Sequence, residues 1–201
     1  MPGILRTIGW MACVFYATIP PFWLMIHPRA NSWRSHSGSP YRVLLPLWIA
    51  MWFLCGLATL PWRHMQWHRT HWSWIPAAAF FAAGLWLYQR SGSGFSIRQL
   101  GGQPEILEGP HEQRLVISGI RGYVRHPIYL GHLSEMLAWS TATGLAVCYG
   151  LTAFAVITGA IMIRMEDAEL EKRFGEDYRR YRKSVPAFIP GIFSWRRIGF
   201  E

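Results

Sequence analysis

The sequence has only three cysteines, and their positions argue against two common kinds of cysteine site. Cys13, Cys55 and Cys148 all lie within long apolar runs and share no close spacing. A disulfide framework or a zinc site depends on such spacing. We therefore interpret the three cysteines as small packing residues in a hydrophobic interior.

Motifs of several enzyme classes are absent as well. The chain has no glycine-rich Walker loop, and no serine, histidine and aspartate in the order of a hydrolase triad. It also has no convincing signal peptide. The first apolar run follows only Arg6, contains Pro20 and Pro21, and lacks a small-residue cleavage site. We expect that run to be a membrane span.

Acidic residues are scarce, because 11 Asp and Glu stand against 20 Lys and Arg, which gives a net charge of +9. Such a surplus can indicate nucleic-acid binding. Here the basic residues concentrate beside the ends of apolar runs, where anionic lipid headgroups are their natural partners. The group Arg179, Arg180, Arg182 and Lys183 is an example. We predict membrane lipids, and no nucleic acid, as partners.

Long apolar runs dominate what is present. Hydrophobic residues make up 51% of the chain, and five of their runs hold almost no charge. A bilayer core of roughly 30 Å takes about 20 helical residues to cross, and helices satisfy their own backbone there. We predict an all-α, polytopic integral membrane protein with about five transmembrane helices. The runs are 8–26, 43–60, 74–88, 128–148 and 149–163.

The basic residues also predict the orientation. Seventeen of the 20 Lys and Arg lie in three segments, which follow the first, third and fifth apolar runs. The other three are Arg6, Arg63 and Arg69. Cytoplasmic loops carry the excess of basic residues, so we predict an N-terminus outside and a cytoplasmic C-terminus, in an inner or plasma membrane. The three segments are 27–42, 89–127 and 164–201. We divide the chain into a three-helix region, 1–90, and a C-terminal core, 91–201.

Three histidines form a candidate metal site. His64, His68 and His71 have the spacing i, i+4 and i+7, which would place them on one face of a helix. Pro61 and the surrounding tryptophans instead favour a turn at the membrane interface, and no nearby carboxylate would orient the imidazoles. We predict the turn, and no metal.

Two polar blocks flank the last two runs, and the hairpin between them returns both to one membrane face. In the first block, Arg125 and His126 precede Pro127, which suits the first turn of a helix. Backbone N–H groups and the positive end of the helix dipole make this an anion-binding position. Gly131 allows another group to approach the helix closely.

The second block continues the last helix out of the membrane. Glu166 and Asp167 lie at the membrane boundary opposite the first block, and Gly175 is a candidate C-cap. Tyr178 and Tyr181 follow on a second, short helix. We predict that the two blocks form one site at the cytoplasmic membrane boundary.

His132 and Glu135 lie inside the fourth run. Ionisable residues within a span are costly and indicate function by default. Either residue is a candidate for removing a proton from an acceptor. The alternative is a His132–Glu135 pair that satisfies itself near the interface.

The motif Arg125-His-Pro-Ile-Tyr-Leu-Gly131, together with Glu166-Asp-Ala-Glu-Leu170 and the tyrosines that follow, carries a family resemblance over residues 115–190. This part of the chain resembles the isoprenylcysteine carboxyl methyltransferase family, to which phospholipid N-methyltransferases are related. The resemblance implies an integral-membrane methyltransferase that uses S-adenosylmethionine and acts on a lipophilic or lipidated acceptor.

The resemblance also implies roles for residues. Where some relatives carry an arginine one turn before the acidic pair, this chain has Met162, and Arg164 is the nearest arginine. We count Arg164 with His132 and Glu135 as candidate catalytic residues. The expected cofactor-binding residues are Arg125, His126, Pro127, Tyr129, Gly131, Glu166, Asp167, Tyr178 and Tyr181.

Two other functions compete with this interpretation. Membrane sterol or fatty-chain reductases, which use NADPH, also contain an Arg-His-Pro-x-Tyr-x-Gly run, but the acidic helix and paired tyrosines favour the methyltransferase. A non-catalytic lipid-binding or transport protein would bind no cofactor. The acceptor atom (oxygen, nitrogen or sulfur) and the oligomeric state stay open.

Overall fold

The computed structural model describes residues 3–35, 39–92 and 115–188, and within these ranges the chain is helical, with no strand. The elements are α1 (Gly3–Ile26), η1 (His27–Arg29), α2 (Ala30–Arg34), α3 (Tyr41–Thr59), η2 (Leu60–Trp62), η3 (His71–Ser73), α4 (Trp74–Gly92), η4 (Gly119–Gly122), α7 (Pro127–Thr143), α8 (Ala146–Phe174) and α9 (Glu176–Ser184). Residues 93–114, which make up most of the segment 89–127, lie outside the described residues, so the division of the chain at residue 90 stays a prediction.

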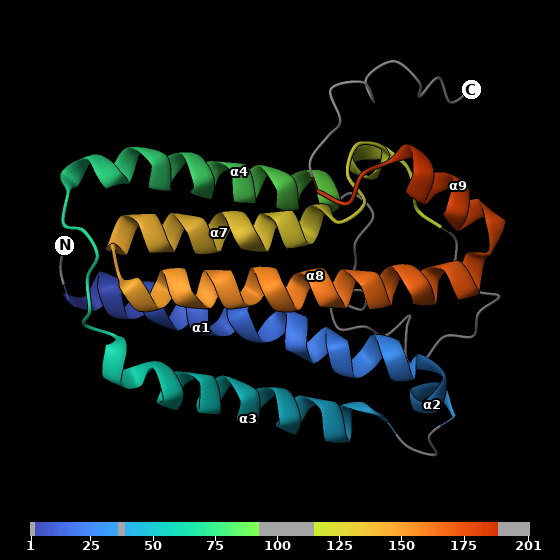
Figure 1. The fold of residues 1–201 in the computed structure, drawn as a ribbon, viewed down its shortest axis with the longest axis horizontal. Coiled ribbons are helices and arrows are strands. Elements are labelled where there is room, and N and C mark those ends of the chain that lie inside the picture. The colour runs from blue at the N-terminus through green and yellow to red at the C-terminus, as the bar shows by residue number, and fades with distance from the viewer. Residues whose placement is uncertain (1–2, 36–38, 93–114, 189–201) are drawn as a thin grey trace.

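Five long helices, α1, α3, α4, α7 and α8, run side by side along the long axis of the molecule (Figure 1). α1 packs against α3, α7 and α8, while α4 packs mainly against α7. Apolar side chains such as Val14, Met136 and Leu151 fill the core between α1, α7 and α8. A hydrogen bond of 3.1 Å between the Ser140 and Thr152 hydroxyls also joins α7 to α8.

Three helical stretches are long and apolar enough to cross a membrane: Gly3–Trp33, Tyr41–Trp62 and Ala146–Phe174. α4, with 19 residues, and α7, with 17, fall short of that combined measure of length and hydropathy. On α3, the side chains of Phe53, Leu54 and Leu57 are 61–65% exposed. An apolar face of this extent is typical of a helix that contacts lipid. The chain is an all-α membrane protein.

The turn between α7 and α8 lies at Gly144 and Leu145, four residues earlier than the boundary at 148/149 that the sequence predicted. That boundary was wrong because the apolar run continues through the turn without a break. Gly144 has a φ of 65°, and a Cβ atom there would lie 2.2 Å from the carbonyl oxygen of His68. Only glycine fits this conformation and this contact. α8 is therefore a single helix of 29 residues that extends beyond the bundle.

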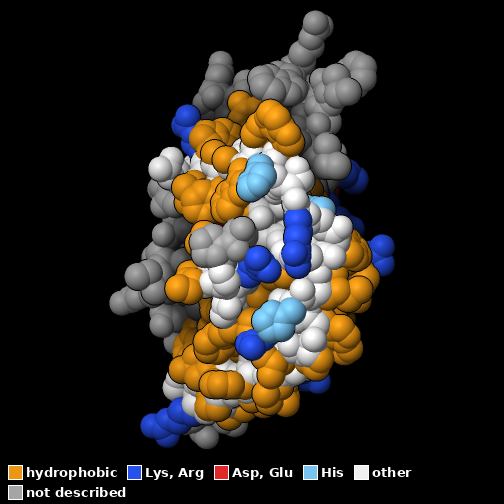
Figure 2. Space-filling model, turned by 90° about the vertical axis from the view of Figure 1, so that its left-hand side faces the viewer, with side chains coloured by type: hydrophobic (Ala, Val, Ile, Leu, Met, Phe, Trp, Pro, Cys, Tyr) orange, Lys and Arg blue, Asp and Glu red, His pale blue; other side chains and the backbone are white. Residues whose placement is uncertain are grey.

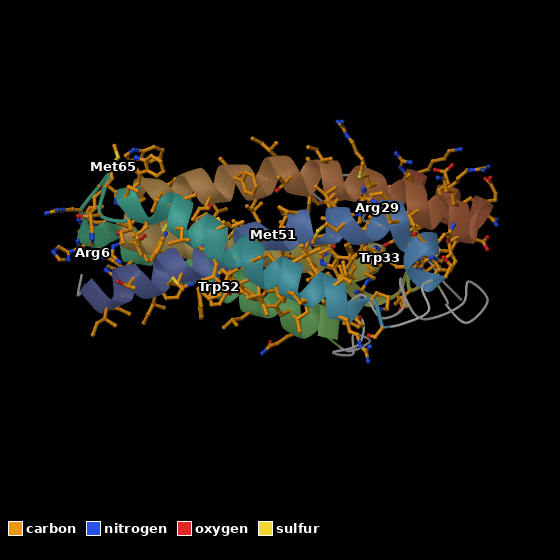
Figure 3. The ribbon with its side chains drawn as sticks, turned by 90° about the horizontal axis from the view of Figure 1, so that it is seen from below. Arg6, Arg29, Trp33, Met51, Trp52 and Met65 are labelled. Carbon is orange, nitrogen blue, oxygen red and sulfur yellow. The ribbon has the colours of Figure 1, made fainter. Side chains whose placement is uncertain are left out.

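The two ends of the helical bundle differ in the segments that lie there. α2, α9 and the C-terminal end of α8 lie together at one end (Figure 1). In Figure 3, Arg29 and Trp33 lie at this end, whereas Arg6 and Met65 lie at the opposite one, with Met51 and Trp52 of α3 between them. The described parts of the three arginine-rich segments thus gather at a single end.

The opposite end is mainly hydrophobic, with scattered arginine and histidine side chains (Figure 2). Trp62, Trp67 and Trp72 are 56–78% exposed there, as expected of an interfacial aromatic belt. Residues 63–70 form no helix, so the three histidines of this segment do not share a helix face. The predicted turn is confirmed. The His68 Nε2 atom lies 3.0 Å from the Tyr149 hydroxyl.

Candidate active site

The site begins where the chain enters α7. α7 starts at Pro127 with His126 as its N-cap residue, as the sequence predicted. The backbone N–H of Arg125 donates to the Pro186 carbonyl at 2.9 Å, and that of His126 donates to the Ala187 carbonyl at 3.1 Å. The segment before α7 and the tail after α9 are therefore tied together, which unites the two polar blocks.

Five side chains make up the boundary cluster: Arg125, His126, Glu166, Asp167 and Tyr178. The Arg125 guanidinium lies 2.9 Å from Oδ2 of Asp167, and the Tyr178 hydroxyl donates to Oδ1 of the same carboxylate. The two ring nitrogens of His126 lie 3.3 Å from Glu166 Oε2 and 3.4 Å from Asp167 Oδ1. Residues about forty positions apart in the sequence thus form one buried network.

The electrostatics of the boundary cluster fix its charges. Burial alone would lower the pKa of His126, but the carboxylates of Glu166 and Asp167 outweigh burial and raise that pKa to about 9. Burial and the hydrogen bond to Asp167 raise the pKa of Tyr178, so its hydroxyl remains a donor. At neutral pH the cluster therefore contains two cations, Arg125 and His126, and two carboxylates.

The remaining cofactor candidates lie around this cluster. The ring of Tyr129 is 5.9 Å from that of His126. Tyr181 packs edge-on against Tyr178, and its hydroxyl donates to the Arg121 carbonyl at 2.7 Å. Gly131 does permit a close approach, but by a residue of α4. A Cβ atom at Gly131 would lie 2.6 Å from the ring of Tyr88.

Two of the three catalytic candidates lie deeper in the bundle. Glu135 is 3% exposed and lies against Gly84 of α4, where a Cβ atom would come within 2.6 Å of Glu135 Oε1. The His132 ring contacts the rings of Tyr16 and Tyr88 at 5.3 and 5.7 Å. Neither His132 Nδ1 nor Glu135 Oε1 has a hydrogen-bond partner among the described residues. The two residues therefore do not form the self-satisfied pair that was the alternative.

Arg164 does not join the other site residues. Its side chain is exposed on α8, with no hydrogen bond or ion pair to any described residue. The reason is helical geometry, because two residues along an α-helix correspond to a rotation of about 200°. Arg164 therefore points away from the direction of Glu166, and the inward position one turn before Glu166 belongs to Met162, which is fully buried.

His27 is a residue near the site that the sequence reasoning missed. It lies just after α1 on η1, which packs against α8, and its ring stacks on Trp23 at 5.1 Å. His27 is only 4% exposed, and neither ring nitrogen has a partner among the described residues. The charge of Glu166 acts on this ring. The sequence did contain a signal that could have identified His27, because a lone ionisable residue at the end of an apolar run indicates function.

Comparison with known proteins places methyltransferases among the relatives of this chain. It is 34% identical over 74 residues to methanethiol S-methyltransferase 2 of Bradyrhizobium diazoefficiens, which is 37% of this chain and 28% of that protein. It is 38% identical over 81 residues to protein-S-isoprenylcysteine O-methyltransferase of Schizosaccharomyces pombe, which is 39% of this chain and 34% of that protein. The resemblance to the isoprenylcysteine carboxyl methyltransferase family is confirmed over this part.

A reductase is also similar. The chain is 35% identical over 86 residues to Delta(14)-sterol reductase of Mus musculus, which is 40% of this chain and 20% of that protein. The chain thus spans about a third or less of the length of these relatives. No family model and no solved structure matches it.

Proposed function

We propose that this chain is an integral-membrane methyltransferase that uses S-adenosylmethionine to methylate a lipophilic acceptor. One observation carries the proposal: His126 contacts both Glu166 and Asp167 at the end of the bundle where the C-terminal tail closes on α7. The similarity to O- and S-methyltransferases supports the same reaction class.

The chemistry of the boundary cluster fits this cofactor. S-adenosylmethionine carries an ammonium, a carboxylate and a sulfonium, and the cluster offers carboxylates for the first and cations for the second. The contacts of His126 Nε2 and Glu166 Oε2 lack hydrogen-bond geometry, so these buried atoms retain unused bonding capacity, as does Arg125 Nε. Buried polar atoms of this kind point to a ligand or water. When bound, the cofactor supplies a methyl group already activated on a positively charged sulfur.

The protein residues then have distinct tasks. Arg125 and His126, at the start of α7, suit an anionic group, and Glu166 suits a cationic one. Asp167 is a positioning residue, because it holds Arg125, His126 and Tyr178 in place. Transfer of an activated methyl needs alignment and exclusion of water more than it needs acid–base chemistry. The tail paired with the start of α7 provides that closure.

We propose five membrane crossings, by α1, α3, α4, α7 and α8, with the N-terminus outside and the site at the cytoplasmic face. The 17-to-3 distribution of basic residues supports this topology. Reporter fusions after Gly109 and after Phe200 are expected to report the same, cytoplasmic, side. Fusions that report opposite sides would contradict both the hairpin and the composite site.

The reaction is tested with S-adenosylmethionine labelled in its methyl group. Membranes that contain the protein should transfer the label to a lipid, a lipidated peptide or a small hydrophobic compound, identified by mass spectrometry. A His126→Ala variant of matched expression is the control for background labelling. Membranes with the wild-type protein that transfer no more label than this variant would contradict the proposal.

The second candidate function is an NADPH-dependent sterol or lipid reductase, which the similarity to Delta(14)-sterol reductase favours. The two cofactors separate the candidates. Thermal stabilisation of the purified protein by NADPH, and not by S-adenosylmethionine, would favour the reductase. A non-catalytic lipid-binding or transport protein would be stabilised by neither.

A further inference from the structure

A second group of polar side chains lies deeper in the bundle, and we call it the mid-bundle cluster. It consists of Tyr16 from α1, Tyr88 from α4, and His132 and Glu135 from α7. The His132 ring contacts both tyrosine rings, with centroid distances of 5.3 Å to Tyr16 and 5.7 Å to Tyr88. Glu135 occupies the space that the missing side chain of Gly84 leaves beside α4. Three helices, two of them from the N-terminal half, therefore build this cluster.

The mid-bundle cluster is buried but not satisfied. His132 Nδ1 and Glu135 Oε1 are buried without a hydrogen-bond partner among the described residues, and the Tyr88 hydroxyl interacts with that of Tyr16. Buried polar atoms without partners are rare in folded proteins, so two in one place need an explanation. Other polar groups in the same bundle do find partners, as the mutual hydrogen bond between Ser140 and Thr152 shows. Unpaired buried atoms also occur in the boundary cluster, where we propose that a ligand binds.

The mid-bundle cluster is continuous with the boundary cluster. The Tyr129 ring lies 5.9 Å from that of His126 on one side and 6.1 Å from that of His132 on the other. His126 and His132 are six residues apart, which corresponds to about 9 Å along a helix. A group bound between the mid-bundle side chains would therefore lie within molecular reach of a cofactor at the boundary cluster.

The charge in the mid-bundle cluster is one-sided. Glu135 is the only carboxylate among the four side chains of the cluster, and none of the four is an arginine or a lysine. A carboxylate acceptor would meet a like charge with no cation to offset it, and burial makes such repulsion severe. A neutral head group with an S–H or O–H would instead donate to Glu135 or His132 and accept from a tyrosine hydroxyl.

We propose that the mid-bundle cluster binds the head group of the acceptor, that this head group is neutral and protic, and that Tyr16 and Tyr88 determine its specificity. This inference rests on the proposed methyltransferase function and names its substrate class. A thiol is preferred to a hydroxyl, because a thiol loses its proton more easily than the corresponding alcohol; even the phenol of tyrosine, with a pKa of about 10, is less acidic than the thiol of cysteine, with a pKa of about 8.5.

The step balances without a further reagent. The acceptor sulfur forms a bond to the methyl carbon while its S–H bond breaks, and the proton passes to Glu135 Oε1 or His132 Nδ1. The electron pair of the broken methyl–sulfonium bond leaves with the cofactor sulfur, which becomes neutral. The proton later leaves to solvent, so the net products are a thioether, the neutral demethylated cofactor and one proton.

Binding of acceptors of equal chain length tests the inference without the cofactor. Decanethiol, decanol and decanoate are added to the purified protein in detergent, and their affinities are measured by calorimetry and thermal stabilisation. We expect decanethiol to bind at least tenfold more tightly than decanoate, with decanol between them. Equal or tighter binding of decanoate would overturn the inference.

Variants of the cluster test the named residues. Tyr16→Phe and Tyr88→Phe keep the rings and should each weaken decanethiol binding by about five- to tenfold, the typical effect of one lost hydrogen bond. Tyr149→Phe, whose hydroxyl contacts His68 at the other end of the bundle, is the matched control and should bind like the wild type. Glu135→Gln should raise decanoate affinity toward that of decanethiol, which a purely structural role would not do. Unchanged selectivity in all three cluster variants would overturn the inference.

Binding of S-adenosylmethionine to the same samples separates this inference from the proposed function. Protein that binds decanethiol but not the cofactor contradicts the methyltransferase and leaves the mid-bundle cluster as a ligand site. Protein that binds the cofactor but prefers decanoate contradicts only the inference.

Discussion

The boundary cluster and the mid-bundle cluster differ in whether their buried ionisable groups have partners of opposite charge. In the boundary cluster, two cations and two carboxylates contact one another, and Asp167 alone has four partners, the fourth being Arg182 at 3.6 Å. In the mid-bundle cluster, Glu135 and His132 have unpaired atoms. A network of paired charges holds a geometry and fails when one member is lost. Unpaired buried groups reduce stability, and we infer that they are retained for a ligand.

The largest expected effect comes from removing the centre of the paired network. Asp167→Ala would leave the buried Arg125 and His126 without their shared carboxylate, so we expect a loss of about 3–5 kcal/mol in the free energy of unfolding. The control is Asp177→Ala, because the Asp177–Arg180 pair is more than 70% exposed. That variant should lose less than about 1 kcal/mol. Similar losses in denaturant unfolding of the two variants would contradict the difference between buried and exposed pairs.

Stability should also depend on pH through His126. Its pKa in the folded protein, about 9, lies above the ordinary 6.5, so the stabilisation is complete below about pH 6.5 and is lost as the pH rises through 9. The full difference corresponds to about 3 kcal/mol. We expect the unfolding free energy without ligand to fall between pH 6 and pH 10, and to fall less in His126→Gln. Parallel pH profiles for the two proteins would contradict this role.

Cofactor affinity should distinguish the two clusters. Glu166→Gln removes a charged partner and should weaken binding of S-adenosylmethionine tenfold to a hundredfold, because a hydrogen bond to a charged group contributes about 1.5–3 kcal/mol. Glu135→Gln should leave this affinity nearly unchanged and lower turnover, as expected of a group used in the chemical step. If Glu135→Gln instead lowers the melting temperature while the folded enzyme keeps its turnover, Glu135 has a structural role.

The smallest effect concerns the attachment of the tail. Tyr181→Phe removes the hydrogen bond to the Arg121 carbonyl but keeps the packing against Tyr178, so we expect a loss of about 1 kcal/mol. Hydrogen exchange in α9 should rise slightly while exchange in α7 stays constant. A loss as large as that of Asp167→Ala would mean that the tail depends on Tyr181 more than on the paired charges.

Local signals explain which parts of the fold could be predicted. Pro127 and Gly175 are helix-end residues, and the structure has helix boundaries at both. The turn at Gly144 was missed because its positive φ interrupts no apolar pattern. The contact between the two polar blocks could be predicted, because the last two apolar runs form a hairpin that returns both blocks to the same end of the bundle. The participation of Tyr16 and Tyr88 could not be predicted, because it depends on how α1 and α4 are rotated against α7.

Calorimetry with the purified wild-type protein in detergent tests the central claim most directly. The account predicts that S-adenosylmethionine and its demethylated product both bind without added metal, and that His126→Ala weakens both. If neither ligand binds to protein shown to be folded by a cooperative thermal transition, the methyltransferase assignment is wrong.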